Sequence, residues 1–279
     1  QEIRDVVTNL SFLMLEAVHA LVFDENAVGA WRKISKRHQE MVKNVKNNVV
    51  YNELCGFVVA ELSLIFLQRD ESLYPEWLRK GDFSKVPRSL KLSAYKSYSV
   101  MLFVQRRTDE LRVFLCLLRE LYRGTRCVLG EIYALLIGAA NEIVSGNGDM
   151  ACKLIAEAAD RAIPDGIVFP FVEFHMLLGG YDNSIIKGRS DRFYRDVQSM
   201  QTRFRRNWSA IYINIYKGGF VSADLTEKEV AVILLSNVGL TNKNIAGCLA
   251  VSVNTIKYHM TNIMGKLGLS SRKQLQKIF

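Results

Sequence analysis

Hydrophobic residues recur at steps of three and four along most of the chain, a spacing that predicts amphipathic helices rather than strands. In the first 180 residues the pattern divides into pairs of helices. The pairs are predicted at about 6–20 with 25–45, 52–68 with 73–80, 90–105 with 108–123, and 130–144 with 149–162. Their starts lie about forty residues apart, as in proteins built from helical-hairpin repeats. We therefore predict an all-α protein with a helical-repeat body.

The clearest pair spans residues 135–166. Small residues near Gly138 allow its first helix to lie close to Ala151 and Ala158 on the second. This unit resembles a tetratricopeptide repeat, although Pro164 falls one residue later than in the usual pattern. The resemblance implies a concave surface, but helical periodicity leaves open whether that surface holds a small molecule, a peptide or nothing. Stacking of the repeats alone would account for the same pattern.

A basic amphipathic segment follows the turn-rich residues 179–188. From Ser190, a residue suited to an N-cap, one side carries an apolar stripe while arginines dominate elsewhere. The stripe is Phe193, Val197, Met200, Phe204 and Trp208, and the arginines are Arg192, Arg195, Arg203, Arg205 and Arg206. A packing helix is the favoured interpretation, with direct phosphate contact as the alternative. Gly218 and Gly219 place a domain boundary near residue 221, which gives three parts: 1–182, 183–221 and 222–279.

The last part is predicted to form four short helices in a compact domain. Each start carries a residue suited to an N-cap: Thr226, Thr241, Ser252, and Ser270 or Ser271. Glu229 follows Thr226 by three residues, as in a capping box.

The third of these helices, at about 253–267, has two different faces. An apolar stripe of Val253, Ile256, Met260, Ile263 and Leu267 predicts a core-facing side. Asn254, Lys257, Tyr258 and Thr261 recur at i, i+3, i+4 and i+7 and share the other side, which is predicted to meet solvent or another molecule.

The net charge of +9 is distributed unevenly. Residues 1–182 hold 22 basic and 23 acidic side chains, whereas residues 183–279 hold 15 basic and five acidic ones. A nearly neutral body followed by a basic end is expected when that end meets a polyanion. A solvated lysine-rich surface is the alternative.

Several protein classes are disfavoured by the composition. The five cysteines are scattered and form no CxxC pair, which argues against zinc sites and a disulfide framework. Charged residues interrupt the most apolar window, 49–67, so a soluble cytoplasmic protein is expected. The four histidines lie far apart and no nucleophile motif is present, so we expect neither an enzyme nor a metal site nor a cofactor. Because residue 1 is Gln rather than Met, we expect the chain to be a fragment of a longer protein.

The C-terminal part strongly resembles the DNA-binding domain of the LuxR/FixJ family of bacterial transcription regulators. The resemblance runs from Leu225 to Leu275, and the main departure is Asn244, where the family usually has Glu. The matching positions are Leu225, Thr226, Glu229, Gly239, Thr241, Asn242, Lys243, Ile245, Ala246, Leu249, Val251, Ser252, Thr255, Ile256, Lys257, His259, Asn262, Ile263, Lys266, Leu267 and Arg272.

The resemblance implies a helix-turn-helix in which residues 242–250 brace and residues 253–266 read the major groove of double-stranded DNA. It implies base contacts by Lys257, Tyr258 and Thr261, and phosphate contacts by Asn242, Lys243, Ser252, Thr255 and Lys266. Asn254 is suited to either a base contact or a phosphate contact. It also implies a homodimer on DNA that pairs through the terminal helix at Arg272, Leu275 and Ile278. Ordinary capping or surface roles remain open for Asn242, Lys243 and Thr255, as does a helix C-terminal role for Lys266.

A weaker resemblance covers residues 151–180, which are similar to the end of the helical sensor domain in MalT-type regulators. It rests on Pro164, Asp165 and Gly166, followed by Phe169, Phe171 and Glu173. Such regulators usually begin with an ATPase module, yet no GxxxxGK[ST] phosphate loop occurs in this sequence. The module is therefore expected to precede this fragment or to be absent from the protein.

These observations favour a sequence-specific transcription regulator whose body receives a small-molecule, peptide or protein signal. A helical-repeat scaffold for protein interactions, with an accessory DNA-binding domain, is the first alternative. A sigma-like factor is the second, although no polymerase-binding region is recognisable.

Overall fold

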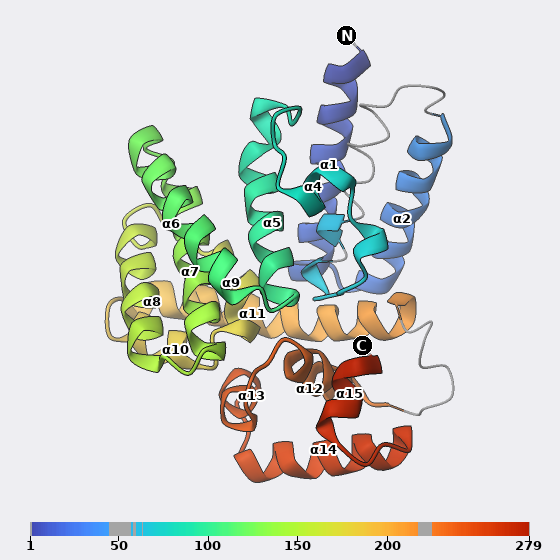
Figure 1. Ribbon diagram of the computed structural model, residues 1–279, viewed down its shortest axis with the longest axis vertical. Helices are drawn as coiled ribbons and strands as arrows, with labels where there is room; N and C mark the ends of the chain where they lie inside the picture. Colours follow the sequence, from blue (N-terminus) through green and yellow to red (C-terminus); the bar gives the residue numbers. More distant parts are fainter. Residues whose placement is uncertain (1, 45–56, 58–59, 63, 217–224, 279) are drawn as a thin grey trace. The chain divides into compact units, whose positions relative to one another are not determined.

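The computed structural model describes residues 2–44, 57, 60–62, 64–216 and 225–278. Every regular element within these ranges is helical (Figure 1). The chain divides into two compact units, each made of two segments. One unit comprises Gln1–Tyr98 and Arg203–Gly219, and the other comprises Ser99–Thr202 and Phe220–Phe279. Of the predicted helix at 52–68, the described residues are 57, 60–62 and 64–68, and the predicted boundary near residue 221 lies outside the described residues.

The first unit is built around a cluster of large aromatic side chains. Trp31 packs edge-on against Phe66 at 5.2 Å between ring centroids, and Phe66 stacks on Trp208 at 5.8 Å. The Trp208 indole N–H donates to the backbone oxygen of Ile65 at 2.7 Å, so this buried polar group is satisfied. The helical elements here are α1 (Glu2–Val22), α2 (Ala27–Asn44), η1 (Glu71–Leu73), α4 (Glu76–Lys80), η2 (Arg88–Leu90), part of α5 (Lys91–Val104), part of α11 (Asp191–Ile211) and η4 (Tyr212–Tyr216).

The second unit contains a helical body centred on one buried helix, α7 (Val128–Val144). It packs between α6 (Thr108–Thr125) and α8 (Gly148–Ala162). The predicted close approach holds, because Ala151 and Ala158 of α8 are fully buried and Gly138 faces Leu154. The body continues through α9 (Phe169–Phe174), η3 (His175–Leu177), α10 (Tyr181–Lys187) and the first part of α11.

A buried polar network fixes the segment between η3 and α10. His175 Nδ1 and Asp182 Oδ2 lie 2.8 Å apart, and Gln201 Nε2 of α11 donates to the same carboxylate at 3.3 Å. The stripe predicted for α11 is buried at Phe193 and Val197, while Met200 is half-buried. The packing role predicted for this helix is therefore confirmed at most of its apolar positions.

The C-terminal helices also belong to the second unit: α12 (Glu227–Asn237), α13 (Asn242–Leu249), α14 (Val253–Leu267) and α15 (Arg272–Ile278) (Figure 1). Their number and positions agree with the sequence-based prediction. Helix α12 contacts α13, α14 and α15, so it forms the centre of this domain. Consistent with that position, all its residues from Glu229 to Asn237 are buried.

Candidate nucleic-acid interface

Helices α13 and α14 are joined by a tight turn of three residues, 250–252. Ala250 takes up a left-handed conformation with φ of 53°, which ends α13, and the Val251 N–H donates to the backbone oxygen of Ala246 at 3.0 Å. Ser252 then caps α14, because its hydroxyl accepts from the Thr255 N–H at 3.1 Å. This helix-turn-helix geometry sets the direction in which α14 leaves the domain.

The apolar stripe of α14 is buried in its middle and open at its ends. Ile256, Met260 and Ile263 are buried against the rest of the domain, as predicted. Val253, however, is 37% exposed and Leu267 is only half-buried, so the prediction that both lie in the core is wrong. Val253 is the first residue of the helix, before the point where the stripe reaches the core.

The opposite face of α14 is open. Asn254, Lys257, Tyr258 and Thr261 are all exposed, and 65% of Tyr258 is accessible to solvent. The Thr261 hydroxyl donates to the backbone oxygen of Lys257 at 3.1 Å, but among the described residues no carboxylate pairs with the Lys257 ammonium group. Because these polar groups have few or no hydrogen-bond partners among the described residues, they are available to an external molecule. We call these four residues the reading face.

The residues predicted to meet phosphates have more varied surroundings. Lys243 and Ser252 are exposed, while Asn242 and Thr255 are half-buried. The Ser252 and Thr255 hydroxyl groups lie 2.9 Å apart within the cap of α14. The amide oxygen of Asn242 accepts a hydrogen bond from Arg272 Nη1 at 3.1 Å, which leaves its NH2 group as a donor.

Lys266, the remaining residue predicted to contact phosphate, is engaged within the domain. Its ammonium group lies 2.8 Å from Glu229 Oε2, and this ion pair connects α14 to α12. Glu229 also completes the predicted capping box, since its carboxylate accepts from the Thr226 N–H at 2.8 Å and its own N–H donates to the Thr226 hydroxyl at 3.3 Å. Burial alone would raise the pKa of Glu229, but the hydrogen bonds from Lys266 and Thr226 outweigh it and hold the pKa below its usual value.

The residues predicted for dimerisation make contacts inside the chain. Arg272 joins α15 to the turn before α13, donating to the backbone oxygen of Leu240 as well as to Asn242. Burial, and to a lesser degree the charge of Arg106, lowers the pKa of Arg272. Leu275 is fully buried, and the side chain of Ile278 lies outside the described residues. Pairing through this helix therefore stays a prediction.

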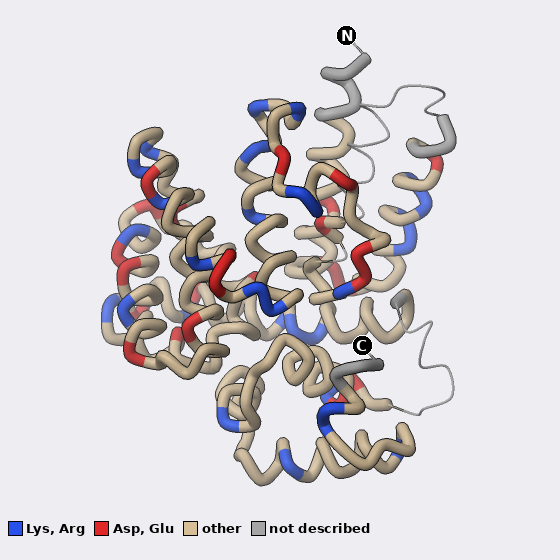
Figure 2. The backbone as a smooth tube through the Cα atoms, in the orientation of Figure 1, with Lys and Arg blue, Asp and Glu red and all other residues tan. Residues whose placement is uncertain are grey.

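Charge around the interface is of one sign. No Asp or Glu follows Glu229 in the sequence, whereas six basic residues do. Figure 2 shows the effect: the charged positions along α13 and α14 are all basic. The charged residues of α13 and α14 are Lys243, Lys257 and Lys266, and those of α15 are Arg272, Lys273 and Lys277. The sequence alone shows that acidic residues are missing after Glu229. A net charge summed over residues 222–279 hides this, because it includes the acidic residues up to Glu229.

The described part of the chain also bears on metal sites and membrane-spanning helices. Its His, Cys, Asp and Glu side chains form no group of three suited to hold a metal ion. None of its helices combines the length and the apolar character that crossing a membrane requires.

Known proteins are similar to the C-terminal region. Residues 223–279 match the family described as bacterial regulatory proteins, luxR family. A Mycobacterium bovis protein named as an HTH-type transcriptional regulator, Mb0914c, is 49% identical over 51 residues, which are 18% of this chain and 6% of that protein. The transcriptional regulatory proteins LnrK and LiaR of Bacillus subtilis are 43% and 42% identical over 51 and 50 residues, again 18% of this chain and 23% and 24% of theirs. No solved structure matches the chain.

The chain thus matches less than a quarter of the length of each of these relatives. The family match and the structure agree on the same region. The matched residues include the capped helices, the tight turn between α13 and α14, and the open face of α14. The C-terminal region, which matches the family over residues 223–279, is a helix-turn-helix DNA-binding domain of the LuxR family.

Proposed function

We propose that this protein is a bacterial sequence-specific transcriptional regulator that reads the major groove with α14 and receives a signal through its helical body. The observation that carries the proposal is the reading face, which is exposed and partly basic on a helix whose other side is buried. A rigid helix with one free polar face is what major-groove recognition requires.

Each residue of the reading face suits a different base edge. The Lys257 ammonium group suits the O6 and N7 acceptors of guanine, and the Asn254 amide suits the N6 and N7 edge of adenine. Tyr258 and Thr261 suit a base edge or a thymine methyl group. We add Val253, because an exposed apolar side chain at the start of the helix suits a thymine methyl group as well.

Phosphate contacts are proposed for Asn242, Lys243, Ser252, Thr255 and Lys266. Lys243 is exposed and is the one basic residue of α13, and the first N–H groups of α14 offer further donors. Lys266 would have to exchange its contact with Glu229 for a phosphate, so we expect its part in binding to be smaller.

Two domains on one site would bind more tightly than one, because the second contact becomes intramolecular. We propose a homodimer on DNA, formed through α15. Since Leu275 is buried and Arg272 is bonded within its own domain, the exposed Lys273 and Gln274 of this helix are the residues we expect nearest a partner.

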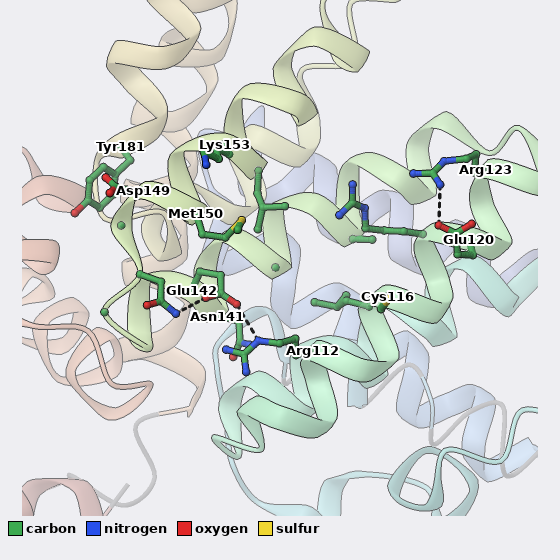
Figure 3. A pocket seen from close by; sticks show the side chains of 18 residues that line it. Arg112, Cys116, Glu120, Arg123, Asn141, Glu142, Asp149, Met150, Lys153 and Tyr181 are labelled. Carbon is green, nitrogen blue, oxygen red and sulfur yellow. Dashed lines mark hydrogen bonds and ion pairs between the residues drawn. The ribbon is translucent and has the colours of Figure 1, made fainter.

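The body is proposed to receive a small-molecule, peptide or protein effector in a groove of about 1140 Å³ formed mainly by α6, α7 and α8 (Figure 3). Its walls carry charges of both signs, and one of its ion pairs joins Arg112 Nε to Glu142 Oε1 at 3.1 Å. The tetratricopeptide-like and MalT-like character of the body, and the division at 1–182, 183–221 and 222–279, remain part of this proposal.

The same groove favours a second candidate function, a helical scaffold that docks a peptide or protein, with DNA binding as an accessory. The two functions are distinguished by measuring how tightly the partner binds. For a scaffold, the partner's affinity is unchanged when Lys257 is substituted and when duplex DNA is added. A regulator responds to its effector by a change in DNA affinity.

The proposal is tested by selecting duplexes from a random pool with the wild-type chain and with Lys257→Ala. We expect the wild type to enrich a common site and the variant to relax it at one position. Lys228→Ala is the matched control, because Lys228 is an exposed lysine of α12 outside the reading face, and its loss removes the same charge. Lys243→Ala is expected to weaken binding to all sequences and to reduce the salt dependence by about one counterion. An unselective pool with the wild type would contradict the proposal.

A further inference from the structure

The near-neutral charge of residues 1–182 hides an uneven distribution. Residues 83–108 hold six basic and no acidic side chains, whereas the remainder of residues 1–182 hold 16 basic and 23 acidic ones. Two of the six, Arg106 and Arg107, form hydrogen bonds or ion pairs within the chain, and Lys96 also interacts there. The other three belong to the unit that begins at Gln1, and we call them the basic ridge: Lys85, Arg88 and Lys91.

Buried neighbours hold the basic ridge at the surface. Val86 and Leu90 are buried, and the Leu90 N–H donates to the backbone oxygen of Pro87 at 2.9 Å in the turn that leads into α5. Two members of the ridge are exposed, and the third, Lys91, is half-buried at the first position of α5. The segment is thus anchored by its apolar residues, and its basic residues reach solvent.

The charge of the basic ridge is not neutralised by its neighbours. Among the described residues, its three side chains form no hydrogen bond or ion pair. The nearest acidic residue in the sequence is Asp82, and hydrogen bonds from Ser84 lower the pKa of that carboxyl group, with the charge of Lys85 as a minor cause. In Figure 2 the charged positions from Lys85 to the end of α5 are all basic. Such a surface complements a polyanion.

The basic ridge does not serve the stability of α5. Negative side chains are favourable in the first turn of a helix, and positive ones are favourable in its last turn. The first turn of α5 contains no acidic residue and begins with Lys91. Neutral substitutions in the ridge should therefore leave the stability unchanged or raise it slightly. Positive charge that does not stabilise the fold is explained better by binding.

The aromatic residues beside the basic ridge help to identify the polyanion. The Phe83 ring packs edge-on against Tyr95, Tyr98 and Trp77, at 4.8, 5.5 and 6.1 Å between ring centroids, and all four residues are half-buried. Single-stranded nucleic acids are bound by stacking bases on open aromatic faces, and membrane surfaces by inserting apolar side chains. Because these rings pack against one another, the ridge offers charge alone, which suits the phosphates of a duplex.

We propose that the basic ridge contacts phosphate groups of duplex DNA outside the base pairs that α14 reads. This inference rests on the proposed function. The chain carries a LuxR-family DNA-binding domain, so a duplex bound there is present at high effective concentration for a second basic surface of the same chain. Phosphate contacts carry no sequence information. The ridge therefore adds affinity and salt dependence and leaves the choice of sequence unchanged.

The contact is tested with the triple variant Lys85→Gln, Arg88→Gln and Lys91→Gln. Affinity is measured by fluorescence anisotropy at several salt concentrations, on the selected site with additional base pairs on both sides. The slope of log affinity against log salt concentration should become shallower by about three counterions per chain, since each phosphate contact releases about one. On a duplex trimmed to the selected site, the two proteins should agree. An unchanged slope on the flanked duplex, or an equal loss on the trimmed one, would overturn the proposal.

A matched control removes three positive charges elsewhere. Lys36 and Arg123 each pair with a carboxylate of their own helix, and Lys228 is the exposed lysine of α12 used above. The control is the triple variant Lys36→Gln, Arg123→Gln and Lys228→Gln. It should keep the wild-type slope on the flanked duplex, and thermal unfolding shows whether both variants are folded. An equal change in slope for the two variants would assign the effect to net charge and overturn the proposal.

A second readout needs only the wild type. Lysine acetylation followed by mass spectrometry should show that the flanked duplex protects Lys85 and that the trimmed duplex does not, with exposed Lys153 as the reference. Equal acetylation of Lys85 with and without the flanked duplex would overturn the proposal. So would binding to vesicles of phosphatidylcholine and phosphatidylserine that depends on the ridge when binding to DNA does not, because that result assigns the ridge to a membrane surface.

Failure of this inference is distinguishable from failure of the proposed function. A wild type that selects no site dependent on Lys257 contradicts the proposed function, and the salt slope of the ridge variant is then compared on a mixed-sequence duplex. Selection that depends on Lys257, together with a salt slope that does not depend on the ridge, contradicts only the inference.

Discussion

Helices α7 and α14 are close in length but differ in how their polar residues are used. Twelve residues of α7 are buried, and its two carboxylates bond inside the body: Glu131 pairs with Arg161, and Glu142 with Arg112. In α14 only Ile256, Met260 and Ile263 are buried. Among the described residues, the side chains of its Asn254 and Lys257 form no hydrogen bond or ion pair. A helix whose polar groups are satisfied within the protein supports the fold, whereas one whose polar groups are left open can recognise a partner.

The largest expected effect tests what the two helices share, a tightly packed apolar face. Ile132→Ala in α7 and Ile263→Ala in α14 each remove a fully buried side chain. Each should lower the free energy of unfolding by about 2–5 kcal/mol, because the lost burial is joined by the cost of a cavity. Denaturant titration measures this. A loss below about 1 kcal/mol at either site would show that its packing is looser than described.

The next effect concerns the carboxylate that ties α14 to α12. Because the pKa of Glu229 is held below its usual value, its contribution to stability is fully present above the unfolded pKa of about 4.3 and is lost as the pH falls through the folded pKa. Glu229→Gln should lower the free energy of unfolding at pH 7 by about 1.5–3 kcal/mol. The wild type and the variant should converge as the pH falls below about 4. A constant difference across this range would contradict the assignment.

A smaller loss of stability is expected from removing the cap of α14, because α7 and α14 differ in how their N-termini are capped. Ser252 caps α14 through its hydroxyl, whereas Cys127 precedes α7 without a capping hydrogen bond from its side chain. Ser252→Ala should therefore cost about 1 kcal/mol of stability, and Cys127→Ala less than about half of that. Thermal unfolding of the two variants decides this, and equal losses would mean that the cap is not responsible.

The smallest expected effect on stability is at the reading face. Tyr258 is mostly exposed, so Tyr258→Ala should change the free energy of unfolding by no more than about 0.5 kcal/mol. Its affinity for duplex DNA should nevertheless fall. A variant that loses stability instead of affinity would assign Tyr258 to the core.

Local patterns were sufficient to predict the elements of the C-terminal domain. The caps at Thr226, Thr241 and Ser252 and the two faces of α14 each depend on residues three or four positions apart, and the structure confirms them. Periodicity failed at Val253, because a repeating pattern does not show where a helix first reaches the core.

Contacts between distant parts of the sequence could not be predicted. Lys266 and Glu229 lie 37 positions apart, and Arg272 reaches the backbone oxygen of Leu240 across 32. Gly180 lies against the backbone of Gly247, and glycine contributes no hydrophobic pattern from which such a contact could be predicted. These contacts follow from tertiary packing, so only the structure reveals them.

The central claim is that the open face of α14 reads bases. The most direct test compares the affinity of the wild type and of Lys257→Ala for the selected duplex and for duplexes that differ from it by one base pair. We predict that the wild type loses about 1–3 kcal/mol of binding free energy at one guanine-containing position and that the variant no longer distinguishes the bases there. Equal discrimination by both proteins at every position would contradict the account.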